Sequence, residues 1–80
     1  MLNRIKEYIN DNEFRFTVFY DRIYVENYKE ILSLEDERIS FLTNKGRLII
    51  KGKNLTLNKM LDNEALIIGK AVDIEVDFHD

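Results

Sequence analysis

The sequence predicts an all-β fold: an antiparallel meander of about seven or eight short strands that forms a small sandwich or barrel, with a short N-terminal helix. The chain of 80 residues contains no proline, so every backbone N–H group after the first residue is available to a sheet. Apolar and polar residues alternate with a period of two after residue 13, and short apolar runs end at Gly or at clusters of Asn, Asp and Glu. We expect one domain over residues 1–80, with strands between 14 and 78, because so short a chain cannot bury a second core.

Only the first residues of the chain show a helical pattern. Leu2, Ile5, Tyr8 and Ile9 recur at spacings of three and four, which predicts a helical lead-in over residues 1–12. The runs that follow are too short for stable helices. The predicted strands are residues 14–20, 22–27, 30–35, 38–43, 47–52, 54–58, 64–69 and 72–78.

A repeated pattern predicts two of the turns. Residues 50–57 and 67–74 both read Ile-x-Gly-Lys followed by alternating apolar positions. Gly at the first central position of a two-residue loop is typical of a type II′ turn, so we expect hairpins with tips at Gly52-Lys53 and Gly69-Lys70. Whether the repeat records a duplication is left open. The resulting pairs are Ile50 with Leu55, Leu48 with Leu57, Ile67 with Val72 and Ala65 with Ile74.

Residues 43–46, Thr-Asn-Lys-Gly, predict a further turn in which Gly46 adopts a positive φ. A three-residue loop would pair Leu42 with Leu48. A four-residue loop from Thr43 would instead give the pairs Phe41–Leu48 and Ile39–Ile50. We prefer the four-residue loop because it buries the larger apolar set.

The charges are distributed unevenly. The net charge of -3 argues against the broad basic surface that nucleic-acid binding requires. Residues 44–60 nevertheless contain five basic residues and no acidic one, whereas residues 61–80 contain six acidic residues and one lysine. Neighbouring strands that pair their outer charges would account for this. The alternative is a basic hairpin that binds an acidic partner or anionic lipid.

Several apolar residues fall on the predicted outer faces of the strands, so parts of the sheet are apolar on both sides. They are Phe19, Tyr24, Leu42, Ile49, Leu66 and Ile68. A second core layer or cover by the N-terminal helix would explain them, and so would a partner-binding surface. The candidate partner-binding residues are Ile49, Leu42, Phe19 and Tyr24, with Lys51 and Lys53 from the basic segment.

No catalytic constellation is evident, and we expect a protein that is not an enzyme and has no cofactor, metal or small-molecule substrate. There is no Cys, and the single histidine, His79, lies next to the C-terminus. Asp73, Glu75 and Asp77 share one strand face at spacings of about 7 Å, too far apart for a calcium cage. No apolar run approaches the roughly 18 residues of a membrane-spanning helix, so we expect a cytoplasmic location.

Residues 24–32 (YVENYKEIL), 38–61 and 64–78 (EALIIGKAVDIEVDF) resemble the YabP/YqfC family of sporulation proteins. The shared features are an apolar strand that ends in Glu26-Asn27, then Gly46, and the two glycine patterns around Gly52 and Gly69. We take these five residues as turn or structural positions. The Glu-Asn pair makes the chain more similar to the YqfC branch.

The resemblance implies a small non-enzymatic protein of endospore-forming bacteria, made in the mother cell and needed for spore development or for coat and cortex assembly. It also implies docking on a membrane protein at the forespore-enveloping membrane. Two alternatives stay open. One is a self-assembling β protein, hence a homo-oligomer. The other is a nucleic-acid-binding barrel that would use Lys45, Arg47, Lys51 and Lys53 beside Phe19, Tyr24 and Tyr28.

Overall fold

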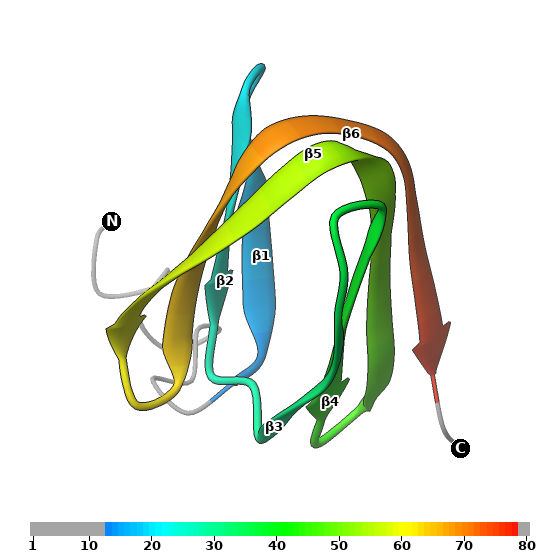
Figure 1. Cartoon of the computed structure of the whole chain (residues 1–80). Helices are drawn as coiled ribbons and strands as arrows, with labels where there is room; N and C mark the ends of the chain where they lie inside the picture. Colours follow the sequence, from blue (N-terminus) through cyan, green and yellow to red (C-terminus); the bar gives the residue numbers. More distant parts are fainter. Residues whose placement is uncertain (1–12, 79–80) are drawn as a thin grey trace, which may run out of the picture.

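The computed structural model of the protein describes residues 13–78, which form six strands and no helix. The strands form one open, antiparallel sheet in the order β1-β2-β6-β5-β4-β3 (Figure 1). The all-β prediction is confirmed, whereas the expected helix over residues 1–12 and His79 lie outside the described residues. The strands are β1 (Arg15–Val18), β2 (Arg22–Glu26), β3 (Glu30–Leu34), β4 (Arg38–Thr43), β5 (Gly46–Leu61) and β6 (Glu64–Phe78).

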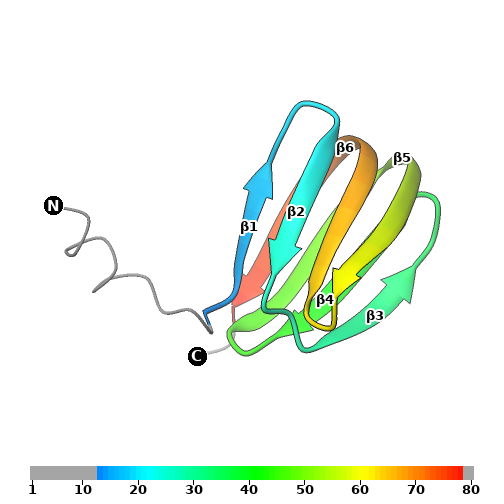
Figure 2. The same cartoon turned by 90° about the vertical axis from the view of Figure 1, so that its left-hand side faces the viewer.

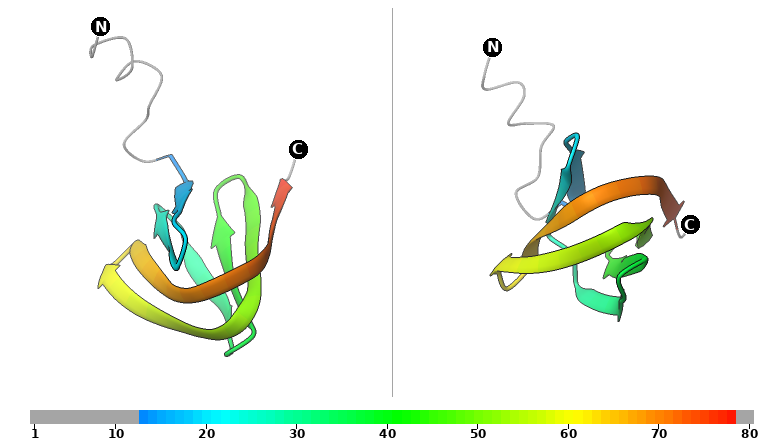
Figure 3. Two further views of the ribbon diagram at one scale, coloured as in Figure 1. Left: turned by 90° about the horizontal axis from the view of Figure 1, so that it is seen from above. Right: turned by 45° about the horizontal axis from the view of Figure 1, so that its top comes forward.

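The sheet is bent on itself because β5 and β6, with 16 and 15 residues, each run through two differently oriented parts of it. We call these parts the β4 half and the β2 half. The β4 half contains β3, β4 and residues 46–53 and 70–78 of the long strands, and the β2 half contains β1, β2 and residues 56–61 and 64–68. The two long strands curve together from one half into the other (Figures 1 and 3). The sheet does not close, so it is neither a barrel nor a pair of separate sheets.

The core lies between the two halves. Its fully buried side chains come from alternate positions of the central strands, as expected for strands with one buried face. The pairs Phe41–Leu48 and Ile39–Ile50 confirm the preferred register of the β4–β5 turn. The turn is tighter than predicted, since Thr43 pairs with Gly46, whose φ of 144° is positive as expected. The core residues exposed by 2% or less are Ile23, Val25, Ile39, Phe41, Leu48, Ile50, Ala65 and Ile67.

The two predicted glycine hairpins are wrong. Gly52 and Gly69 lie inside the continuous strands β5 and β6, so eight predicted strands become six. The ladder pairs Gly52 with Ala71 and Lys53 with Lys70, which places the two copies of the repeat opposite each other in one long hairpin. In place of the predicted pairs, Leu48 lies opposite Val76, Ile50 opposite Ile74 and Leu57 opposite Ile67.

Two bulges make the bend at which these glycines lie. Asn54 and Leu55 of β5 lie opposite Gly69 alone, and Val72 is an extra residue on β6. Asn54 and Gly69 have positive φ values of 53° and 134°. A Cβ atom on Gly52 would lie 2.3 Å from the Lys70 carbonyl oxygen. At Gly52 the backbones of β5 and β6 therefore approach too closely for a side chain. Glycine is typical both of such a bulge and of a tight turn, which is why its local pattern predicted turns here.

Backbone hydrogen bonds hold the bend from both sides. The N–H groups of Gly52 and Leu55 donate to the carbonyls of Glu37 and Asp36 in the β3–β4 turn, at 3.0 and 2.8 Å. The Gly69 N–H donates to the Asp21 carbonyl in the β1–β2 turn at 3.0 Å. Over residues 13–78, no helix exists that could cross a membrane.

Candidate functional site

Three of the six candidate partner-binding residues lie together on the outer face of the β4 half. Leu42 comes from β4, and Ile49 and Lys51 come from β5. Leu42 and Ile49 are half-buried, while their chain neighbours Phe41, Leu48 and Ile50 point into the core. Ile49 lies opposite Ser40 on β4 and opposite Glu75 on β6. We call Leu32, Leu42 and Ile49 with the cations Arg38, Arg47 and Lys51 the outer patch.

The outer patch contains a shallow hollow. Its volume is about 290 Å³, and Ile49 and Leu32 contribute apolar side chains to it. Leu32 is exposed here because the β3–β4 register shifts between Ile31 and Ser33. The hollow therefore combines apolar and charged groups. The lining residues are Leu32, Ser33, Glu35, Arg38, Ser40, Arg47 and Ile49.

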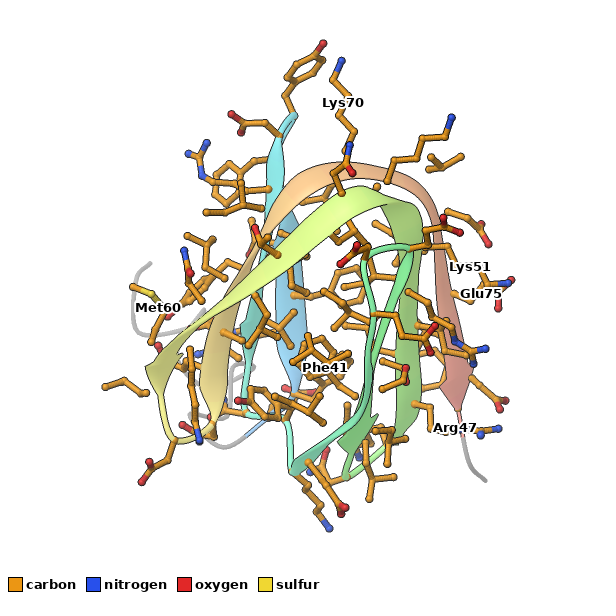
Figure 4. The ribbon with its side chains drawn as sticks, in the orientation of Figure 1. Phe41, Arg47, Lys51, Met60, Lys70 and Glu75 are labelled. Atoms are coloured by element: carbon orange, nitrogen blue, oxygen red, sulfur yellow. The ribbon has the colours of Figure 1, made fainter. Side chains whose placement is uncertain are left out.

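A row of bases and a row of acids lie side by side on the outer face of the β4 half (Figure 4). Arg47 Nη2 lies 3.0 Å from Asp77 Oδ2, and Lys51 Nζ lies 3.7 Å from Glu75 Oε1. This confirms that the basic and acidic segments are neighbouring strands with paired outer charges. All four side chains are about half exposed, so each pair contributes about 0–1 kcal/mol to stability.

Tyr24, the fourth candidate residue, lies on the outer face of the other half, the β2 half. Its hydroxyl donates a hydrogen bond to Glu64 Oε1. This bond, aided by burial and by the negative charge of Glu64, raises the pKa of Tyr24 to about 12. Tyr24 also lies opposite Leu66 on β6. It therefore has internal partners and does not extend the outer patch.

Phe19 and Lys53 lie apart from the other candidates, at the end of the molecule where the sheet bends. Phe19 belongs to the β1–β2 turn, and the Arg22 guanidinium lies 4.4 Å from its ring centroid. Lys70 lies 5.5 Å from the ring of Tyr20, which is 86% exposed, at the same end of the molecule (Figure 4). Tyr20 was missed because the predicted strand ran over residues 14–20, whereas β1 ends at Val18 and Tyr20 lies in the turn.

Glu26 and Asn27 have structural roles. Glu26 accepts a hydrogen bond from Arg15 Nε at 2.9 Å. Asn27 has a φ of 63°, and its N–H donates to the Asn63 carbonyl at 2.7 Å. Its side-chain amide donates to the Glu13 carbonyl at 2.8 Å and accepts from Asn63 Nδ2 at 3.0 Å. The Glu-Asn pair thus connects β2 to β1 and to the β5–β6 turn.

Sequence reasoning missed the free edge of β6. Residues 71–78 pair with β5 on one side, while β2 pairs with β6 only as far as Ile68. In Figure 2 this end of β6 lies behind β1. A hollow of about 390 Å³ lies between them, lined by Phe78, Lys45 and residues 13–16. The strict alternation of residues 72–78 predicts a strand but does not say whether both of its sides are paired.

Neither the outer patch nor the free edge of β6 has the ligand set of a metal centre. Within residues 13–78, no group of three or more His, Cys, Asp or Glu side chains is placed to hold a metal ion. The acidic residues of β6 are distributed along a strand instead of converging. The chemistry that this arrangement offers is that of binding through apolar contact, charge and backbone hydrogen bonds.

Comparison with known proteins finds one family. The model described as the YabP family matches residues 20–77, which include all six strands except β1 and the last residue of β6. No curated protein and no solved structure matches the chain.

Proposed function

The chain belongs to the YabP family, and from this membership we propose that it is a non-enzymatic adaptor or assembly protein of endospore formation. Membership of the family points to a role related to sporulation. The proposed mode of action is to bind a protein partner through the outer patch. The resemblance of Glu26-Asn27 to the YqfC pattern supports placing the chain in that branch.

The observation that carries this proposal is the apolar centre of the outer patch. Ile49 and Leu42 are half-buried on a face that no other described element covers, and Leu32 beside them is 44% exposed. Arg38 has no ion pair in the described part of the chain, and Lys51 is held only loosely, at 3.7 Å from Glu75. Apolar side chains surrounded by a polar, charged rim are typical of protein interfaces.

The proposed partner is a membrane protein of the forespore-enveloping membrane, and the chain would act on its mother-cell side. Support for this comes from the resemblance, because family members are commonly encoded beside a membrane protein. The outer patch suits a partner with acidic groups around an apolar contact, since its unpaired or loosely paired charges are basic.

The nucleic-acid alternative gains little from the geometry. Tyr28, one of its suggested stacking residues, is only 5% exposed, and the Tyr24 hydroxyl is bonded to Glu64. Arg47 and Lys51 lie beside the carboxylates of Asp77 and Glu75, whose negative charge repels a phosphate backbone.

The test is the substitution Ile49→Lys in a tagged chain expressed in sporulating cells of the source organism. A lysine at this position places a charge in the apolar centre, so we expect loss of membrane-protein recovery in a pull-down and fewer mature spores. Thr56→Lys is the matched control, because Thr56 is exposed in the β2 half and lies opposite Ile68.

Unchanged recovery with Ile49→Lys would exclude the outer patch as the interface. A transcript level that stays constant through spore formation would count against the developmental role itself.

A further inference from the structure

The edge of β6 beyond the bend is long, regular and unpaired. Residues 73–78 pair with β5 without a register shift, and no described strand pairs with their other side. Natural sheets commonly protect such edges with Pro, Lys, a bulge or a covering loop. Residues 73–78 contain no Pro, Lys or bulge, and charge protects this edge only through Asp73, Glu75 and Asp77, which repel an acidic strand but attract a basic one.

The outer row of this edge is acidic. Asp73, Glu75 and Asp77 lie opposite the β5 residues Lys51, Ile49 and Arg47. Glu75 and Asp77 pair with β5, yet their side chains remain 50% and 55% exposed. Asp73 has no ion pair to any residue between 13 and 78. Negative charge therefore lies along the side from which another strand would approach.

The inner row of the same edge is apolar and incompletely covered. Ile74 and Val76 are half-buried against the core, and Phe78 is 66% exposed. The hollow of about 390 Å³ separates Phe78 from Phe14 and Phe16 of the first strand region. An added strand that pointed apolar side chains inward would fill this space and bury Phe78.

We infer that the free edge of β6 binds an extended partner segment in which basic and apolar residues alternate. The segment adds as a strand, its backbone pairs with residues 71–78, its basic side chains face the acidic row, and its apolar side chains enter the hollow. A second copy of this chain is the wrong occupant for β6, because antiparallel pairing of two β6 edges would set acids opposite acids.

The test uses the full chain and three seven-residue synthetic peptides. One alternates lysine with valine, one alternates glutamate with valine, and one contains the same lysines and valines in two blocks. We expect saturable binding of the lysine–valine alternating peptide below about 1 mM. Amide hydrogen exchange followed by NMR should show that the amides of residues 71–78 that point away from β5 are protected at least about tenfold more with this peptide bound. The other two peptides should give no such protection.

A pair of isosteric variants tests the charges. Glu75→Gln combined with Asp77→Asn should weaken binding of the lysine–valine peptide about tenfold. Glu30→Gln combined with Asp36→Asn is the matched control, since it removes the same charge from exposed residues of β3 and the β3–β4 turn and should leave binding unchanged.

Four results would overturn the inference. They are absence of binding at 1 mM peptide, equal binding of the glutamate or block peptide, protection at another strand, and slow exchange, before any peptide is added, of those amides in residues 71–78 that point away from β5. The last result would mean that the chain itself or a second copy already covers the edge. The inference goes beyond the proposed function, because the peptide assay can fail while the outer patch and the sporulation role stand.

Discussion

The β4 half and the β2 half share the strands β5 and β6, but the two halves use them differently. On the inner face, both halves contribute buried Ile residues, but the β4 half adds Phe41 and Leu48, whereas the β2 half adds the smaller Val25 and Ala65. On the outer face, the β4 half has two neighbouring rows of opposite charge, whereas the β2 half has the cross-strand ion pair Arg15–Glu26 and the hydrogen bond from Tyr24 to Glu64.

This difference shows how one pair of strands can serve two purposes. Burial imposes the same requirement on both inner faces, namely apolar side chains at alternate positions. The outer faces are free of that requirement. Both carry apolar side chains, but in the β4 half these lie beside Arg38, which has no ion pair in the described part of the chain, and beside the loosely held Lys51. The outer patch and the β6 edge are therefore both in the half that contributes most to the core, which gives the binding surfaces a rigid support.

The largest expected effect comes from removing the central aromatic residue of the β4 half. Phe41→Ala should lower the free energy of unfolding by about 3–5 kcal/mol, because Phe41 is fully buried and its ring centroid lies 4.9 Å from that of Tyr28. Ile23→Ala in the β2 half is the comparison and should cost about 2–4 kcal/mol. Urea denaturation measures both. A larger loss of unfolding free energy for Ile23→Ala would show that the core residues of the β2 half contribute more to stability than those of the β4 half.

The next effect concerns the bend that joins the two halves. Gly69→Ala should destabilise the protein by about 1–3 kcal/mol, because φ is 134° and the new Cβ would lie 3.0 Å from Leu55 Cδ2. Lys53→Ala, at an exposed position of the same bend, should change stability by less than about 0.5 kcal/mol. Thermal unfolding distinguishes the two. If Gly69→Ala is as harmless as Lys53→Ala, the bend does not depend on this glycine.

A smaller effect, of opposite sign, is expected at the segment that passes from the β2 half to the β4 half. The buried Tyr28 hydroxyl makes no hydrogen bond within the described chain, and burial, with the negative charge of Asp62 adding, raises the pKa of Tyr28. Tyr28→Phe should therefore increase the free energy of unfolding by about 1 kcal/mol, since it removes an unsatisfied polar group. A measured loss of stability would show that the hydroxyl has a partner.

The smallest effect at neutral pH concerns the outer face of the β2 half. The pKa of Tyr24 is raised from 10.0 to about 12, chiefly by its hydrogen bond to Glu64. The stability that this hydrogen bond contributes is therefore complete below pH 10 and is lost as the pH rises to about 12. Tyr24→Phe should thus show a shallower loss of stability than the natural chain between these pH values. NMR titration of the ring carbons should also show the pKa of Tyr24 falling towards 10.0 in Glu64→Gln. An unchanged titration would exclude Glu64 as the cause.

The reliable part of the sequence prediction came from local alternation. It identified Ile39, Phe41, Leu48 and Ile50 as one buried face, and the register of the β4–β5 turn followed from the apolar area buried. The charge asymmetry correctly placed the basic and acidic segments beside each other. Alternation also placed Leu42, Ile49 and Tyr24 on outer faces. Tyr24 lies on the β2 half, however, and Phe19 and Lys53 lie at the bend, so only part of the candidate set comes together.

The less reliable part depended on contacts between distant residues. Whether Gly52 ends a strand or bends it is decided by Lys70, whose carbonyl oxygen would lie 2.3 Å from an added Cβ atom. The free edge of β6 likewise exists because β2 stops pairing at Ile68. The residues adjacent in sequence to Gly52 or to the β6 edge therefore do not reveal the bend or the unpaired edge.

The amino-acid sequence by itself determined that this chain forms strands, which of their faces are buried, and which segments carry each charge. These properties depend on neighbours within a few residues, where alternation and side-chain chemistry act directly. Only the tertiary structure decided that the glycine patterns are two sides of one bend, and that β6 keeps an unpaired edge. Both outcomes depend on which strands meet across the bend, and that is settled by packing the whole core at once.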